Sequence, residues 1–131
     1  LALSGSNSWP GGTTVRGGTL RAESEHALGE GAVTVDGGTL DAATITTVAR
    51  LRLRQGTVRV HVGRGRLVSE GPLELGGRAS LRVGFDRDWS GRPVRVLTGS
   101  RLSGRFRSVE AVDGTRLDVE HRRDGVYVSR R

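Results

Sequence analysis

Arginine is the residue type in this sequence whose number and spacing could do chemistry. The 131-residue chain carries 21 lysine or arginine residues, all of them arginine, against 14 acidic residues, and its formal net charge is +7. A guanidinium group presents its N–H donors in a planar fork that matches the oxygens of carboxylate, sulfate or phosphate groups. The composition therefore indicates recognition of an anion.

The arginines are concentrated in the middle of the chain. Residues 1–44 carry a net charge of −3 (two arginines, five acids), residues 45–82 carry +6 (eight and two), and residues 83–131 carry +4 (eleven and seven). In the middle segment arginines alternate with apolar residues, which places them on one face of a strand. We predict an outward basic strip that binds a ligand; the alternative is a solvated face of a chain rich in arginine. The predicted ligand-binding residues are Arg50, Arg52, Arg54, Arg59, His61, Arg82 and Trp89.

Trp89 is one of only two tryptophans and lies in the polar segment DRDWSGRP. A tryptophan ring can stack on a sugar ring, and we include Trp89 in the predicted site for that reason. The alternative is a hydrophobic lid that closes one end of the fold.

Catalytic and metal-binding constellations are not predicted. The chain has no cysteine, and His26, His61 and His121 are far apart, without the spacing of metal ligands. Asp86 and Asp88 form a carboxylate pair, but a two-residue spacing in a polar segment is typical of a turn. We expect no catalytic residue, no metal and no cofactor, and a protein that is not an enzyme.

A sequence repeat indicates which elements position the arginines. TVRGGTLRA, at residues 14–22, and TVDGGTLDA, at residues 34–42, agree at seven of nine positions with an offset of twenty residues. Short strands and glycine turns that repeat with such a period are typical of a β-solenoid, in which each repeat forms one coil. We predict an all-β chain of about four coils. It forms a single domain, with repeat coils over 1–83 and a terminal coil and cap over 84–131, and is a fragment of a longer protein.

Residues of neighbouring coils should stack in columns about 4.8 Å apart. The two positions at which the repeats differ exchange arginine for aspartate, which favours stacking because opposite charges then face each other across strands. The expected apolar columns are Val15 over Val35 and Leu20 over Leu40, and the expected charge pairs are Arg16 over Asp36 and Arg21 over Asp41. The columns of the basic strip are expected to lack such acidic partners.

The segment LALSGSNSWPGGTTVRGGTLRA, with the later ALGEGAVTVDGGTLDA, resembles the autotransporter-associated β-strand repeat. The resemblance covers residues 1 to about 42, with Trp9 where tyrosine is usual. It implies a right-handed parallel β-helix in an exported bacterial protein. Such repeats occur in passenger domains and as accessory parts of secreted polysaccharide-degrading enzymes. Residues 45–82 depart from the repeat through their arginines.

Two functions follow from these expectations. The first is a non-catalytic carbohydrate-binding module for an acidic polysaccharide, a glycosaminoglycan or a uronic-acid polymer, attached to a catalytic domain in the parent chain. The alternative is a structural stalk or spacer of a passenger or adhesin, without a ligand of its own. We do not expect a nucleic-acid partner, because the chain has few aromatic side chains for base stacking, or a membrane partner, because no apolar run reaches the length of a span. Weak self-association through an open edge at Leu1 to Leu3 is expected.

Overall fold

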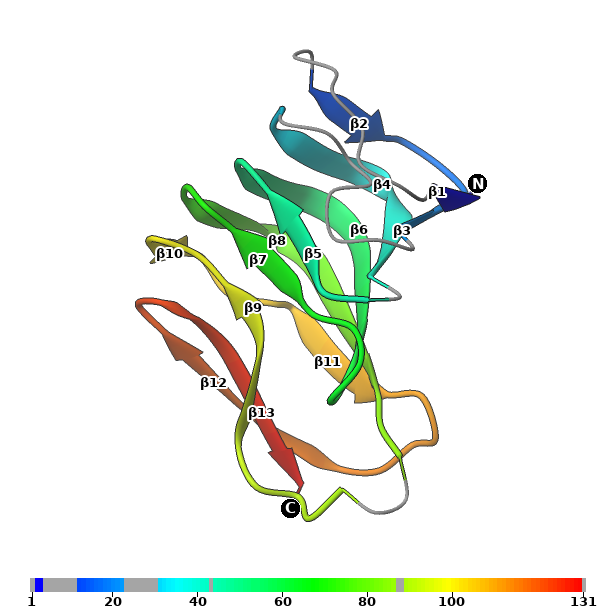
Figure 1. Ribbon diagram of the computed structural model, residues 1–131, viewed down its shortest axis with the longest axis vertical. Coiled ribbons are helices and arrows are strands. Elements are labelled where there is room, and N and C mark those ends of the chain that lie inside the picture. The colour runs from blue at the N-terminus through cyan, green and yellow to red at the C-terminus, as the bar shows by residue number, and fades with distance from the viewer. Residues whose placement is uncertain (1, 4–11, 23–30, 43, 87–88, 131) are drawn as a thin grey trace.

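The computed structural model describes residues 2–3, 12–22, 31–42, 44–86 and 89–130. The regular secondary structure in these ranges is entirely strand and forms two sheets, here called sheet A and sheet B (Figure 1). Sheet A comprises β1 (Ala2–Leu3), β2 (Thr13–Val15), β3 (Thr19–Ala22), β4 (Val33–Ala42), β6 (Leu51–His61), β8 (Leu73–Gly84), β10 (Leu102–Ser103) and β11 (Ser108–Ala111), and sheet B comprises β5 (Thr46–Val48), β7 (Leu67–Ser69), β9 (Val94–Thr98), β12 (Leu117–Arg122) and β13 (Gly125–Arg130). The prediction of an all-β fold is confirmed.

Up to the final hairpin, the strands of both sheets follow the chain in order from one end of the molecule to the other (Figure 1). In the hairpin the order is reversed, and β13 lies between β9 and β12. In sheet A, β3, β4, β6 and β8 are neighbours and pair in parallel, and in sheet B the same holds for β5, β7 and β9. The chain therefore alternates between the sheets, passing from β4 to β5, from β6 to β7 and from β8 to β9. None of the described residues forms a helix long and apolar enough to cross a membrane.

The core lies between the two sheets because alternate residues of each strand point inward. In β6, Leu51, Leu53 and Val58 are completely buried. Arg54 and Arg59, on the other face of the strand, are exposed. Sheet B contributes residues such as Leu67 and Leu97 to the same apolar cluster. The period of two in the sequence thus becomes the inner and outer faces of the sheets.

The repeat of the sequence coincides with the pairing register. Val15 lies beside Val35, and Leu20 lies beside Leu40, as predicted. The second of these columns runs across five strands through Leu20, Leu40, Val58, Leu81 and Val109. The intervals along the chain between successive members of this column are unequal, so the register holds although the repeat length does not.

The two predicted charge pairs have different outcomes. Arg21 is the register neighbour of Asp41, as expected. The expected pair of Arg16 and Asp36 is wrong, because the pairing of β2 with β4 ends at Val15, one residue before Arg16. Asp36 instead accepts a hydrogen bond of 2.9 Å from Nε2 of Gln55 on β6.

The C-terminal end of the molecule departs from the parallel pattern. β12 and β13 form an antiparallel hairpin in which Arg122 pairs with Gly125 across a turn at Arg123 and Asp124, and β13 pairs antiparallel with β9. Three residues considered in the sequence, Trp9, His26 and Asp88, lie outside the described residues, as does Leu1 of the predicted open edge.

Candidate functional site

The basic strip predicted from the sequence lies mainly along β6, which is one long strand with a bend. The bend spans residues 54–56, where the pairing with β8 shifts between Leu53 and Gln55 and Gly56 has a positive φ. Arg52 precedes the bend, Arg54 lies in it, and Arg59 and His61 follow it. Arg82 is on the neighbouring strand β8, directly beside Arg59.

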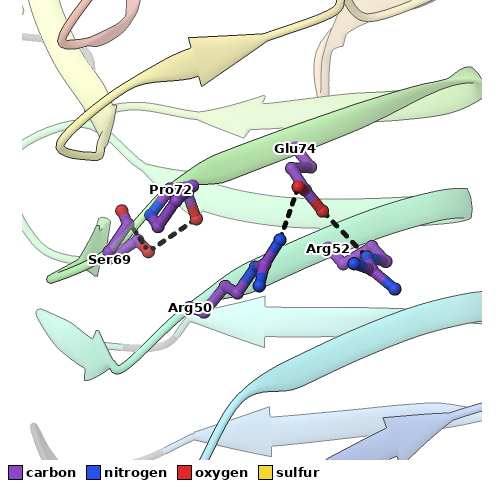
Figure 2. Close-up of polar contacts among 6 residues, drawn as sticks. Arg50, Arg52, Ser69, Pro72 and Glu74 are labelled. Carbon is purple, nitrogen blue, oxygen red and sulfur yellow. Dashed lines mark hydrogen bonds and ion pairs between the residues drawn. The ribbon is translucent and has the colours of Figure 1, made fainter.

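At the beginning of β6 two arginines converge on one carboxylate (Figure 2). Nη2 of Arg50 lies 2.6 Å from Oε1 of Glu74, and Nε of Arg52 lies 2.8 Å from Oε2 of the same side chain. The register that pairs Arg52 with Glu74 holds the three groups together. Both oxygens of Glu74 are therefore engaged by guanidinium groups of the protein itself.

This arrangement changes the electrostatics that the sequence predicted. Hydrogen bonds, chiefly from Arg52 and to a lesser extent from Arg50, lower the pKa of Glu74 below its usual value, so the carboxylate is charged at neutral pH. The expectation that the strip lacks acidic partners is wrong here, because the interval between β6 and β8 is longer than the visible repeat and brings Glu74 beside the arginines. Two of the predicted ligand-binding guanidiniums are therefore already paired with a carboxylate of the same chain.

At the other end of the strip the arginines lie in a column of alternating and like charges. Arg21, Asp41, Arg59, Arg82 and Glu110 follow one another in a column across the outer face of sheet A. Here too acidic residues flank the arginines, contrary to the expectation from the sequence. Arg59 and Arg82 nevertheless form a like-charged neighbouring pair. Both are exposed, and neither makes an ion pair within 4 Å with any residue in the described ranges.

His61 ends β6 in a small polar cluster that the sequence did not reveal. Its register neighbour is Gly84, where a β-carbon would approach Nδ1 of the imidazole to 2.8 Å, so the glycine leaves room for the ring. Nε2 of His61 lies 3.2 Å from Oδ1 of Asp86, and Nη2 of Arg64 lies 3.4 Å from Oδ2 of the same carboxylate. The only signal in the sequence was the tight turn in HVGRGR, which places Arg64 shortly after His61.

Trp89 packs against the core and contacts an arginine that is not part of the predicted strip. Its ring centroid is 5.0 Å from that of Phe85, and the guanidinium carbon of Arg130 lies 5.4 Å from the centroid of the indole ring. Arg130 also donates a hydrogen bond of 2.9 Å to the carbonyl oxygen of Trp89. These contacts favour the hydrophobic lid, which the sequence left open as the alternative to a sugar-stacking platform.

The polar groups beside the strip do not assemble into a metal centre. Across the part of the chain that the structure describes, no group of three or more histidine, cysteine, aspartate or glutamate side chains could hold a metal ion. The buried hydroxyl of Ser69 donates to the carbonyl oxygens of Gly71 and Pro72 at 3.0 and 3.2 Å, which gives it a structural role in the turn after β7 (Figure 2).

The chain is thus an all-β protein with mainly parallel strands and arginines on the outer face of one sheet. Comparison with protein families identifies residues 1–22 as a match to the passenger-associated-transport-repeat, which confirms the predicted resemblance over that segment. This kind of repeat is associated with the secreted passenger domains of autotransporters. Neither a curated protein nor a solved structure matches the chain.

Proposed function

We propose that the chain is a structural, non-catalytic segment of an exported bacterial protein of the passenger type. In this proposal it is a right-handed parallel β-helix in which the coils β4–β5, β6–β7 and β8–β9 each contribute one strand to each sheet, and the β12–β13 hairpin caps the stack. The observation that carries the proposal is the coincidence of sequence repeat and register, in which residues of the passenger repeat lie beside their equivalents in the next repeat. Such a segment sets a length, since every coil adds one strand spacing.

Adding one coil tests this structural role. Duplicating residues 51–72 in tandem inserts one repeat unit, because Leu51 is the register neighbour of Leu73. We expect the longer chain to keep its strand content and its cooperative unfolding, and to lengthen by about 4.8 Å. Circular dichroism and small-angle X-ray scattering measure these quantities. The matched control inserts the same segment in scrambled order and should disrupt the stack; loss of cooperative unfolding in the duplicated chain itself would contradict the proposal.

We propose binding of an acidic polysaccharide as a second function, which a specific observation favours. Arg59 and Arg82 are neighbours on parallel strands, and like charges in that position repel each other unless an anion lies between them. Arg54 adds a third exposed guanidinium on the same strand as Arg59. A glycosaminoglycan or uronic-acid polymer that runs across the strands would neutralise this end of the strip, and the segment would then hold an attached catalytic domain on its substrate.

Replacement of both Arg59 and Arg82 by a neutral residue tests polysaccharide binding. We expect heparin or polygalacturonate to bind at low salt, and the double substitution Arg59→Gln, Arg82→Gln to weaken binding more than tenfold, about 1.4 kcal/mol. The matched control is Arg92→Gln, Arg123→Gln, which removes the same charge at two other exposed positions. Equal weakening by both double variants in a calorimetric titration would show that net charge alone attracts the polymer and would refute a defined strip.

A further inference from the structure

A cavity of about 270 Å³ lies where the chain enters sheet B, at the beginnings of β5, β7 and β9. It is formed by Ile45 just before β5, by the turn from His61 to Arg66 before β7, and by the first residues of β9. The backbone N–H of Thr46 donates a hydrogen bond of 2.9 Å to the carbonyl oxygen of Arg66, so the first two of these segments are fixed to each other. The cavity lies outside both proposed functions.

The interior of this cavity is apolar. Val62 and Val96 are buried members of the core, and Val94 packs partly against it. Ile45 lies at the cavity with 41% of its surface exposed, which is unusual here, because among the described residues only Val112 is another large hydrophobic residue with comparable exposure. An apolar compound in this cavity would therefore remove the Ile45 side chain from water.

The polar groups around the cavity are basic. Arg64, Arg66 and Arg95 line it, and none of the lining residues that the structure describes is acidic. Arg64 lies 3.4 Å from Asp86, and Arg95 lies 2.9 Å from Asp124, so two of the three guanidiniums already have a carboxylate. Arg66 is exposed and makes no ion pair with any residue in the described ranges, which leaves its fork of donors available to a ligand.

We propose that this cavity binds a small organic carboxylate with an apolar body, whose carboxylate pairs with Arg66 and whose hydrocarbon part contacts Ile45 and the valines. A guanidinium and a carboxylate can form two parallel hydrogen bonds, which fixes the orientation of the ligand. The cavity holds roughly nine water volumes, which suits an alkyl carboxylate such as hexanoate. An apolar pocket with few convergent polar groups is the usual form of a small-molecule site.

Titration of the 131-residue chain with hexanoate and with the neutral hexanamide tests the proposal. Backbone amide shifts should change around Val62 to Arg66 with a dissociation constant on the order of 1 mM, and hexanamide should bind at least fivefold more weakly. Arg66→Gln should weaken hexanoate binding at least fivefold, whereas the matched control Arg78→Gln, at an exposed arginine on β8, should leave it within twofold. Ile45→Asn should weaken binding of both compounds.

Three results would overturn this site. These are the absence of localised shifts up to about 20 mM hexanoate, equal affinity for hexanoate and hexanamide, and equal weakening by Arg66→Gln and Arg78→Gln. Circular dichroism of each variant separates a lost site from a lost fold. Because the cavity does not include Arg59 or Arg82, its failure would leave both functional proposals unaffected.

Discussion

Replacement of Gly56 by alanine is expected to lower the free energy of unfolding by about 3 to 5 kcal/mol. Gly56 lies at the bend of β6 with a φ of +106°, a conformation that an L-residue adopts only with strain. A β-carbon there would also overlap sterically with the carbonyl oxygen of Gly38 on β4. Because β6 is paired on both sides, the strand cannot move away without breaking its hydrogen bonds to β4 or β8.

Two other glycines separate the contributions to this effect. Gly77→Ala should change the free energy of unfolding by less than about 0.5 kcal/mol, since its β-carbon would meet no atom within 4 Å. Gly114→Ala should cost about 1 kcal/mol, because its φ is +83° but the space around it is open. Urea unfolding of the three variants measures the series. If Gly56→Ala were no more destabilising than Gly114→Ala, close approach of β4 and β6 at the bend would be refuted.

Truncation of Leu53 to alanine is expected to cost about 2 to 5 kcal/mol of unfolding free energy. The side chain is completely buried in the middle of sheet A, with Val35 of β4 on one side and Leu75 of β8 on the other. Removal of its outer carbons leaves a cavity that paired strands on both sides hold open, so little of the lost packing can be recovered.

The adjacent residue supplies the control for this prediction. Arg54→Ala should alter the free energy of unfolding by less than about 0.5 kcal/mol, because Arg54 is exposed on the opposite face of the same strand. Leu53→Ile keeps the volume and should cost less than about 1.5 kcal/mol. Chemical denaturation of the three variants gives the comparison, and similar losses at positions 53 and 54 would contradict an inner and an outer face of β6.

The columns of the first two sequence repeats could be predicted from sequence because repeat offset and register are the same quantity there. Once TVRGGTLRA and TVDGGTLDA are aligned, the pairs Val15–Val35 and Leu20–Leu40 follow directly. The hairpin at the C-terminal end was equally accessible, because an Arg-Asp-Gly turn lies between two alternating segments. Local patterns were sufficient for both features.

The polar contacts of the candidate site could not be predicted in the same way. Which acid meets Arg52 depends on the length of chain between β6 and β8, and this length differs from the repeat that is visible in the sequence. The contact of His61 with Asp86 needs both that register and the open space at Gly84. The Arg16–Asp36 pair failed for a local reason, since β2 ends just before Arg16. Which charged side chains meet therefore depends on the long-range register of the strands. Which side chains are buried follows from the alternation of apolar residues within each strand.

The unequal advance of the chain along the Leu20 to Val109 column has a consequence for how such a protein can vary. Intervals of different length produce the same alignment of apolar side chains, so the differences are taken up outside the paired positions. In-frame insertions and deletions between strands are therefore nearly neutral for the core. A single-residue deletion within a strand inverts its two faces unless a register shift, such as the one between β6 and β8, absorbs it. Inherited variation in length should accumulate at the turns, where it alters the outer surface of the stack and leaves its interior unchanged.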